Sequence, residues 1–334
     1  MKLSDFVAFF LANKGVKHVF AVSGGASLHL IHSIAETENI DFVCPQHEQA
    51  AAMAADSYSR VTGRFGAAVA TSGPGATNLI TGICGAYYDS VPVMYITGQV
   101  ATHRMKGDTG VRQIGFQETE IVDMCKSITN YAVRINNPND IKYELEKSYY
   151  LSKAGRPGPV LIDIPDDLQR EEIIPENLRS YVEEKRKTKL KISNKKLADC
   201  HSLIRDAERP IIILGWGIHL AQGYKELDKF LLKFPIPVVS TWALAHAIPS
   251  NHPMWVGTFG THGTRYANFA VQNSDLIISI GSRLDTKATG SPTKTFAREA
   301  KKIMVDIDPH ELNKFKRYDL NFDHLIHSDV KEFL

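Results

Sequence analysis

The amino-acid sequence predicts an α/β protein with two doubly wound domains, each built on a mostly parallel sheet. Short apolar runs without polar alternation recur along the 334 residues, with helical patterns between them. This is the pattern of strands buried on both faces. Glycine turns follow several of the runs, and a highly charged stretch, residues 173–196, separates the two halves. We therefore expect domains at residues 1–172 and 197–334, joined by a charged linker.

The elements expected in the first half follow one another without long interruptions. The segment "SDFVAFFLANKG" has helical spacing, with Ser4 as its N-cap and Gly15 just after its end. Pro45 favours a helix start, which puts Glu48 in the first turn of the alanine-rich helix in "CPQHEQAAAMAADSYSR". The expected strands lie in "VKHVFAVSGG", "IDFVCPQ", "RFGAAVATSGPGATN", "VPVMYITGQ" and "GPVLIDIP".

The second half resumes the same alternation. Its expected strands lie in "RPIIILGWGI", "IPVVST", "SDLIISIGSR" and "KKIMVDIDP". In the linker, the basic piece "KRKTKLK", residues 185–191, has acidic residues around it and no aromatic array. A solvated connection between domains fits this composition better than a nucleic-acid patch does.

Bulk composition narrows the class of protein further. The formal net charge is +2, which gives no reason to expect nucleic acid or an anionic membrane as a partner. No apolar run approaches the roughly 20 residues that span a bilayer, and the N-terminus lacks the pattern of a signal peptide. The four scattered cysteines form no CxxC pair. We therefore expect structural thiols in a reducing cytoplasm and no metal site.

Three features at expected strand ends in the first half are candidates for chemistry. Glu48, on a slim alanine helix, either favours the helix dipole or, if partly buried, exchanges protons. The turn in "TSGPGATN", residues 71–78, opens a helix with Thr77 as a plausible cap. Its backbone amides can hold a polar ligand, or it is only a tight turn. A glycine turn in "AVSGGAS", residues 21–27, follows another strand, and ligands gather where parallel strands end.

The second half has weaker candidates. "LGWGIHLA" has two glycines of a dinucleotide turn but lacks the third. Arg283, in "GSRLDTKATG", meets either a phosphate or a surface carboxylate. In "VDIDPHE", Asp306 and Asp308 stand at a strand end, where an acid accepts hydrogen bonds from a ribose or caps the helix that begins near Pro309.

Taken in order, these segments resemble the thiamine-diphosphate enzymes of the acetolactate synthase group. The resemblance covers nearly all of the chain and is carried by "VFAVSGGAS", "HEQAAAMAADSYSRVTG", "VATSGPGATNLITGI", "VPVMYITGQV", "GFQETE", "GRPGPVLIDIPDD", "GTHGTRYANFAVQNSDLIISIGSRLD" and "DIDPHELNK". It implies a pyrimidine-binding domain followed by a Rossmann-like middle domain. It also implies that Glu48 bonds N1′ of the cofactor aminopyrimidine and favours its imino tautomer, and that Gln117 lines the reaction centre. The residues that would shape the pyrimidine pocket are Gly24, Gly25, Pro74, Gly75 and Asn78.

For the middle domain, the resemblance implies a nucleotide site. Members of the synthase group hold FAD there as a structural cofactor, whereas relatives outside that group bind another adenine nucleotide or nothing. The matching positions are Arg156, His262, Gly263, Gly281, Arg283 and Asp306.

The chain departs from the family pattern in three places. Val22-Ser23 stands where the synthases usually carry Tyr-Pro, and the loop "ATHRMKGDTGVRQIG" is longer and more basic than expected. In that loop Arg104, Lys106 and Arg112 either meet an anionic substrate or are ordinary surface charges. The third departure is that the Gly-Asp-Gly…Asn motif, which holds Mg²⁺ and the diphosphate in the family, does not occur here. We therefore expect the C-terminal diphosphate-binding domain to be absent from this chain, and the chain alone to be inactive.

The function implied by the resemblance is decarboxylation of a 2-keto acid followed by carboligation, in a homodimer or homotetramer. Within the same family, the alternatives are a plain 2-keto acid decarboxylase and a diketone hydrolase. A noncatalytic partner subunit is an alternative of another class, and the presence of Glu48 argues against it. An unrelated pair of nucleotide-binding domains is disfavoured by the incomplete glycine motif and the lack of a Walker lysine.

Overall fold

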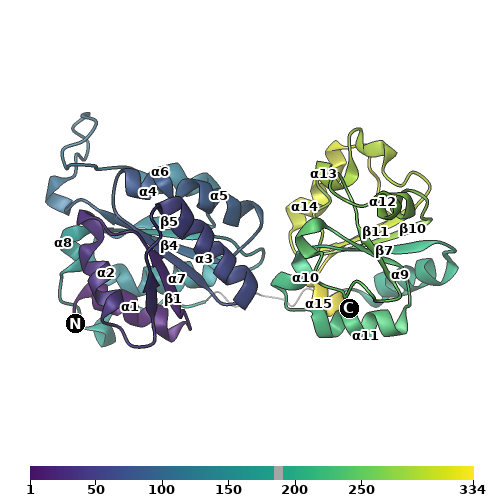
Figure 1. The fold of residues 1–334 in the computed structure, drawn as a ribbon, viewed down its shortest axis with the longest axis horizontal. Coiled ribbons are helices and arrows are strands. Elements are labelled where there is room, and N and C mark those ends of the chain that lie inside the picture. Colours follow the sequence, from purple (N-terminus) through teal and green to yellow (C-terminus); the bar gives the residue numbers. More distant parts are fainter. Residues whose placement is uncertain (184–190) are drawn as a thin grey trace. The chain divides into compact units, whose positions relative to one another are not determined.

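The computed structural model describes residues 1–183 and 191–334, so most of the basic segment at 185–191 lies outside the described residues. The chain divides into two compact units, Met1–Lys185 and Arg186–Leu334. Each unit is a parallel sheet with helices on both faces (Figure 1). The predicted fold class, two doubly wound α/β domains, is therefore confirmed.

The sheet of the first unit has the strand order β2-β1-β3-β4-β6-β5, with all neighbours parallel. Its strands are β1 (His18–Ala21), β2 (Asp41–Val43), β3 (Gly66–Ala70), β4 (Val93–Gln99), β5 (Tyr131–Arg134) and β6 (Val160–Pro165). Its helices are α1 (Leu3–Asn13), α2 (Leu28–Ala35), α3 (Glu48–Thr62), α4 (Pro74–Asn78), α5 (Ile80–Tyr88), α6 (Ile121–Cys125), α7 (Ile141–Lys153) and α8 (Asp166–Gln169). From β1 the chain adds β2 toward one edge of the sheet, and from β3 on it adds strands toward the other edge. The strand order therefore reverses between β1 and β3.

Alternate residues of the buried strands supply two separate cores. On one face Ala67 and Val69 of β3 pack with residues of α1, α2 and α7. On the other face Ala68 and Ala70 pack with residues of α3, α5 and α6. Both faces are apolar because both are covered, and this explains why the strands show no polar alternation in sequence.

Close packing explains the alanines of α3. A Cβ at Gly82 of α5 would lie 2.3 Å from the Cβ of Ala52, and a Cβ at Gly66 of β3 would lie 2.3 Å from the carbonyl oxygen of Ala55. Side chains larger than methyl on this face of α3 would push the helix away from the sheet. The small residues thus fix where the first turn of α3, and with it Glu48, lies.

The start of α1 differs from the prediction. Helix α1 begins at Leu3, with Lys2 as its N-cap residue, so the expectation that Ser4 is the N-cap was wrong. Ser4 is buried inside the first turn, where its Oγ accepts a hydrogen bond of 2.8 Å from the Oγ of Ser33 in α2. A buried partner on a neighbouring helix has taken the hydroxyl that the sequence suggested for capping. Gly15 follows the helix with φ of +79°, as predicted.

The sheet of the second unit has the order β12-β11-β10-β7-β8-β9. Counted within this unit, the order is 6-5-4-1-2-3, which is the doubly wound Rossmann order with its switch point between β7 and β10. The strands are β7 (Pro210–Leu214), β8 (Val238–Ser240), β9 (Trp255–Thr258), β10 (Leu276–Ile280), β11 (Lys301–Asp306) and β12 (His324–His327). The helices are α9 (Asn194–Asp206), α10 (Gly217–Leu220), α11 (Tyr224–Lys233), α12 (Arg265–Gln272), α13 (Thr286–Thr289), α14 (Pro309–Asn313) and α15 (Val330–Phe333).

Part of the charged stretch after β6 packs on the first unit. Lys2 and Glu172 form an antiparallel bridge, and Ile173 is buried in the first core. Further along, the backbone N–H of Tyr181 donates to Glu146 of α7 over 2.7 Å. Sparse apolar residues in a charged segment are therefore enough to attach it to a domain surface.

We expect opposite effects from alanine at two glycines of α5. Gly82→Ala should destabilise the first unit by roughly 1–3 kcal/mol because its methyl would overlap Ala52. Gly85→Ala, the matched control, has no atom within 4 Å of the new methyl and should stabilise by up to about 1 kcal/mol through helix propensity. Urea unfolding followed by far-UV circular dichroism measures both; equal effects of the two substitutions would contradict the close packing of α5 on α3.

Candidate functional site

The polar candidates of the first unit lie at the carboxyl ends of four neighbouring strands. The segments that follow β2, β1, β3 and β4 contain, in this order, Glu48, the Gly24-Gly25 turn, the Pro74-Gly75 turn and Gln117. The carboxyl ends of parallel strands all lie at one edge of a sheet. Such sheets bind ligands at their switch point, which here lies between the neighbouring strands β1 and β3. The fold therefore brings together residues that are up to about 90 positions apart in sequence.

Glu48 is the first residue of α3 and is half-buried. Asn78, the last residue of α4, donates a hydrogen bond of 2.9 Å from Nδ2 to Oε2 of Glu48. The other oxygen, Oε1, faces Gly75, where a Cβ would lie 3.3 Å from it. One carboxylate oxygen is thus held in place by the protein, and the other lies against a residue without a side chain.

The turn before Asn78 is capped differently from the prediction. Gly73, with φ of +62°, is the N-cap residue of α4, and Pro74 is its first residue. Thr77 lies inside the helix and donates from its Oγ1 to the carbonyl of Pro74 over 3.2 Å. The expectation that Thr77 is the cap was therefore wrong. A hydroxyl in this position bonds back along its own helix.

Thr71 joins two of the glycine turns and was not anticipated from the sequence. Its Oγ1 accepts a hydrogen bond of 3.1 Å from the backbone N–H of Ala26. Its methyl would be 2.4 Å from a Cβ at Gly24 and 2.7 Å from a Cβ at Gly75. Both glycines therefore make room for one threonine side chain, whereas Gly25 has open space beside it.

Gln117 is held against the glycine turn in a strained backbone conformation. Its φ is +63°, and its Cβ would be 2.6 Å from a Cβ at Gly73. A non-glycine residue in this region costs on the order of 1 kcal/mol or more, so neighbouring contacts must maintain it. Strain of this kind is concentrated at functional sites.

Glu118 supplies one of those contacts. The carboxylate, 8% exposed, accepts hydrogen bonds from the backbone N–H groups of Lys106 at 2.8 Å and Ile114 at 3.0 Å. Burial alone would raise the pKa of Glu118, but these hydrogen bonds and one at Gly115 hold that pKa below its usual value. One side chain thus closes the base of the basic loop directly beside Gln117.

A second set of contacts ties the same segment to the sheet. The buried carboxylate of Asp163 on β6 accepts from Thr97 Oγ1 at 2.7 Å and from Gln99 Nε2 at 3.0 Å. Gln99 Nε2 also donates to the carbonyl of Thr119 at 2.7 Å. Arg134 lies 3.6 Å from Asp163 and also pairs with Glu120. Burial raises the pKa of Asp163 to about 7, against the lowering effect of Thr97, Gln99 and Arg134.

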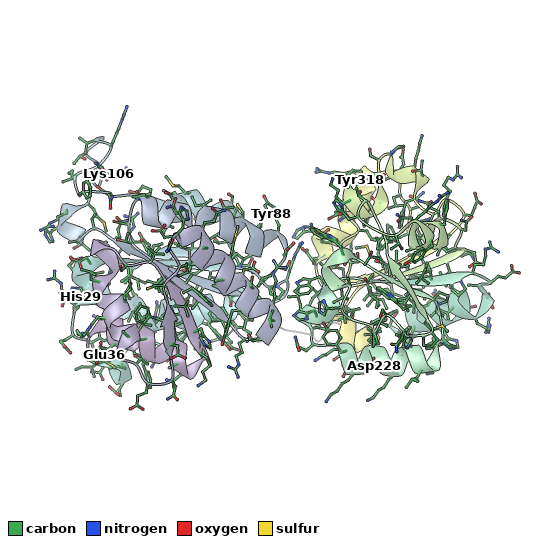
Figure 2. The ribbon with its side chains drawn as sticks, in the orientation of Figure 1. His29, Glu36, Tyr88, Lys106, Asp228 and Tyr318 are labelled. Carbon is green, nitrogen blue, oxygen red and sulfur yellow. The ribbon has the colours of Figure 1, made fainter. Side chains whose placement is uncertain are left out.

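The basic loop projects from the body of the first unit, with Lys106 near its base (Figure 2). The Nζ of Lys106 lies 3.9 Å from Glu120, so this cation has a carboxylate partner. Arg104 and Arg112 are exposed.

In the second unit, the loops after β7 and β10 meet at the switch point. The N–H of Gly217 donates to the carbonyl of Gly281 at 3.0 Å, and a Cβ at Gly215 would lie 2.2 Å from that oxygen. Gly281 has φ of +61°, a conformation that favours glycine. The backbones of the two loops therefore run together where a Rossmann sheet binds its nucleotide.

The charged candidates of the second unit lie on one side of this point, after β10 and at the end of β11. Arg283, half-exposed, pairs with Asp285 at 3.0 Å. Asp306 ends β11, and its Oδ1 accepts from the backbone N–H of Asp308 at 2.9 Å. The residue that caps α14 is Asp308, which accepts from the N–H of His310. Asp308, and not Asp306, therefore caps this helix.

The remaining candidates are separated. His262 is exposed, with its ring centroid 5.8 Å from that of Trp242, and Gly263 follows it in the loop between β9 and α12. Arg156 lies in the first unit, in the turn before β6, and donates to the Oγ of Ser90 at 2.8 Å. Ser90 precedes β4, so this contact is at the edge of the sheet opposite Glu48.

Two features are not found within residues 1–183 and 191–334. No group of three or more histidine, cysteine, aspartate or glutamate side chains is arranged to hold a metal ion. No helix in these ranges combines the length and the apolar character needed to cross a membrane. The cysteines at 44, 84, 125 and 200 are all unpaired.

Two models of known protein families match this chain. Residues 1–124 match the family described as thiamine pyrophosphate enzyme, N-terminal TPP binding domain. Residues 197–334 match the thiamine pyrophosphate enzyme central domain. The family resemblance predicted from the motifs is confirmed, and the two matches fall on separate structural units.

Individual relatives carry the name acetolactate synthase. Acetolactate synthase 2 of Nicotiana tabacum is 38% identical over 323 residues, which are 95% of this chain and 46% of that protein. The acetolactate synthase large subunit of Corynebacterium glutamicum is 39% identical over 307 residues, or 90% of this chain and 47% of that protein. The acetolactate synthase of Arthrospira platensis is 37% identical over 332 residues, which are 97% of this chain and 55% of that protein. The chain thus spans about half the length of the curated relatives it matches.

The Asp163 cluster predicts a pH-dependent stability. The folded pKa of about 7 exceeds the unfolded value near 4, so between these values the folded state keeps a proton that the unfolded chain has released. Stability should therefore fall as pH rises from about 4 to 7, by up to roughly 4 kcal/mol. Asp163→Asn, which cannot titrate, should flatten this slope in urea unfolding.

The control for this prediction is Asp123→Asn. Asp123 is exposed and pairs with Lys126 at 2.6 Å, a contact that lowers its pKa, so this variant should keep the downward slope. A slope that persists unchanged in Asp163→Asn would show that Asp163 is not its source.

Proposed function

The chain belongs to the thiamine pyrophosphate enzymes, and from this premise we propose that it forms the pyrimidine-binding and middle parts of an acetolactate synthase-like enzyme. The reaction is decarboxylation of a 2-keto acid and transfer of the remaining acyl unit to a second carbonyl compound. The observation that carries the proposal is the Glu48–Asn78 pair at the switch point of the first sheet. The names of the relatives support the choice of reaction.

The residues around Glu48 fit an aminopyrimidine ring. Oε2 is fixed by Asn78, and Oε1 faces Gly75, so the carboxylate has an oxygen for a ring nitrogen N1′. At Gly25, a Cβ would have no atom within 4 Å of it, which leaves space in the neighbouring turn. An apolar or cationic side chain in place of Glu48 would not provide an acceptor there.

When bound, thiamine diphosphate supplies the electron sink for the carbon that loses CO₂. The protein's own work is to hold and orient. Glu48 would hold N1′ of the cofactor and favour its imino tautomer, while Asn78 keeps the carboxylate oriented and Thr71 fixes the spacing of the two glycine turns. Gln117, held at positive φ by the Glu118 and Gln99 contacts, would line the reaction centre.

The proposal also includes parts of the protein beyond these two domains. We assign the diphosphate and Mg²⁺ to the region of the longer relatives that this chain does not span. We further propose a homodimer or homotetramer, because family sites form between the pyrimidine domain of one chain and the diphosphate domain of another. The four unpaired cysteines favour a reducing compartment, the cytoplasm.

For the middle unit we propose an adenine-nucleotide site, with FAD as the first candidate. The support is the contact between the Gly217 and Gly281 loops at the switch point, with Arg283 after β10 and Asp306 at the end of the adjacent strand β11. Arg283 would bond a phosphate oxygen, either in place of its partner Asp285 or in addition to it. His262 and Gly263 belong to a neighbouring loop of the same sheet edge; Arg156, in the other unit, has no such support within its own unit.

Glu48→Gln tests the proposed role in the full-length enzyme. Glutamine keeps the shape but offers a weaker, neutral acceptor, so turnover should fall by about 10²–10⁴-fold while the unfolding midpoint stays within error. Glu36→Gln, at the exposed end of α2, is the matched control and should retain full activity. Near-normal turnover in Glu48→Gln would refute the assignment. Assays with and without an acceptor separate carboligation from plain decarboxylation.

Flavin content tests the middle-unit site. The purified chain should be yellow, or should become so with added FAD, and Arg283→Ala should weaken flavin binding about tenfold or more because a charge-assisted bond is lost. Arg265→Ala, which removes an exposed cation that lies over Phe269, should bind flavin normally. A colourless protein that gains no flavin on dialysis against FAD would remove FAD from the proposal.

A further inference from the structure

A buried lysine without a carboxylate partner lies beside a cavity in the second unit. Lys302, the second residue of β11, is only 6% exposed, and its Nζ donates to the carbonyl of Ala300 at 2.7 Å. Among the described residues, no carboxylate forms an ion pair with this ammonium. Burial lowers the pKa of Lys302, and Asp323 and Glu299 oppose that effect only from a distance. Lysine is almost never buried this deeply without a paired anion.

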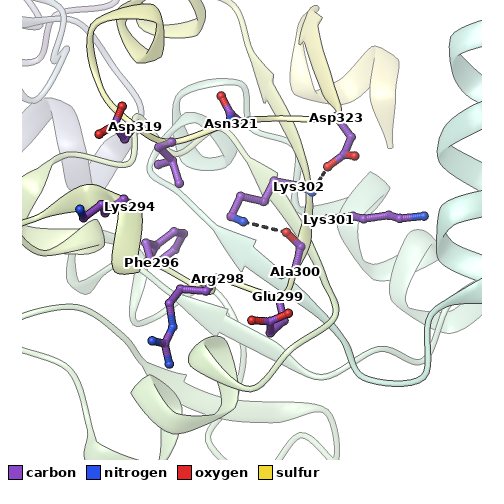
Figure 3. A pocket seen from close by; sticks show the side chains of 11 residues that line it. Lys294, Phe296, Arg298, Glu299, Ala300, Lys301, Lys302, Asp319, Asn321 and Asp323 are labelled. Carbon is purple, nitrogen blue, oxygen red and sulfur yellow. Dashed lines mark hydrogen bonds between the residues drawn. The ribbon is translucent and has the colours of Figure 1, made fainter.

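The cavity that adjoins Lys302 has a volume of about 300 Å³. Figure 3 shows the Lys302 side chain among the residues that line this space, with its Nζ bonded to the carbonyl of Ala300. The walls include Phe296 and Leu320, both buried, and the exposed Lys294 and Arg298. This space is large enough for a small organic molecule and has a cationic group in its wall.

The cavity is not part of the nucleotide edge of this sheet. It is lined by the first residues of β11, Lys301 and Lys302, and by Asp323, directly before β12. Asp306 and Gly281 mark the other ends of β11 and β10. A ligand in this cavity would therefore occupy a site separate from the adenine-nucleotide site proposed above.

The surrounding charges limit the ligand to a single negative charge. Carboxylates of Glu299, Asp319 and Asp323 also line the cavity, and they would repel a polyphosphate. Asp323 is already engaged, since its Oδ2 accepts the backbone N–H of Lys302 at 2.8 Å. The ammonium of Lys302 has no anionic acceptor among the described residues. The carboxylate of a ligand would provide one through a charge-assisted hydrogen bond.

We propose that this cavity binds a small carboxylate monoanion, with Lys302 as its buried counter-charge and Arg298 at its mouth. Binding neutralises the ammonium and fills space beside Phe296 and Leu320. The site is independent of the thiamine-dependent function, so either proposal can fail without the other.

The test uses the three tryptophans of the chain, Trp216, Trp242 and Trp255, all of which lie in the second unit. Their fluorescence therefore follows the unfolding of this unit in urea. With acetate as the probe, titrated against chloride at constant ionic strength, the unfolding free energy of the wild type should rise with concentration as expected for one bound ligand.

Lys302→Met should weaken acetate binding at least tenfold, and Lys301→Met is its matched control. Lys301 also lines the cavity, but it is exposed and its side chain extends away from that of Lys302 (Figure 3), so its variant should lose far less acetate affinity than Lys302→Met. Equal stabilisation of the wild type and Lys302→Met, or no difference between acetate and chloride, would overturn the proposal. If Lys302→Met does not fold, Arg298→Gln at the exposed mouth replaces it, and unchanged acetate affinity in that variant would overturn the proposal equally.

Discussion

The site of the first unit depends on how closely α3 approaches the sheet. Alanines at 52 and 55 meet glycines at 82 and 66 with no room for another methyl group. This contact sets the height of α3 above the strand ends and so the place of Glu48 at its first turn. The Asn78 hydrogen bond and the Thr71 contacts then require only short side chains, because the backbones are already near one another.

Buried charges are treated differently in the two units. Asp163 has two neutral donors and an arginine, and Arg134 in turn has Glu120, so the charge belongs to a network that reaches the segment of Gln117. Among the residues that the structure describes, the ammonium of Lys302 donates to a single carbonyl, that of Ala300. Networks in which all members are satisfied make a structure rigid, whereas a partly satisfied group is the place where a ligand can add most.

Much of the fold was predictable because strands buried on both faces have a strong signature. The unexpected strands β5, β9 and β12 are short, and most of their residues are only half-buried, so their sequences lack a continuous apolar run. Motif resemblance pointed to Glu48 and Gln117. It could not reveal Thr71, Glu118 or Asp163 as supports, because their roles arise from contacts with partners as far as 66 positions away. The two capping predictions were wrong because each hydroxyl has another hydrogen-bond partner. Ser4 is bonded to Ser33 of a neighbouring helix, and Thr77 is bonded to the carbonyl of Pro74 in its own helix.

The closure of the basic loop by Glu118 has a consequence for how related enzymes can diverge. Within the loop, the backbone at Lys106 and at Ile114 is bonded to one carboxylate. The residues between these two points can therefore change without moving Gln117. Doubling the length of a flexible loop costs only about 0.6 kcal/mol in closure entropy. Insertions and changes of charge at the tip therefore cost little stability, and evolution can alter what approaches this edge of the sheet without rebuilding the residues beneath it.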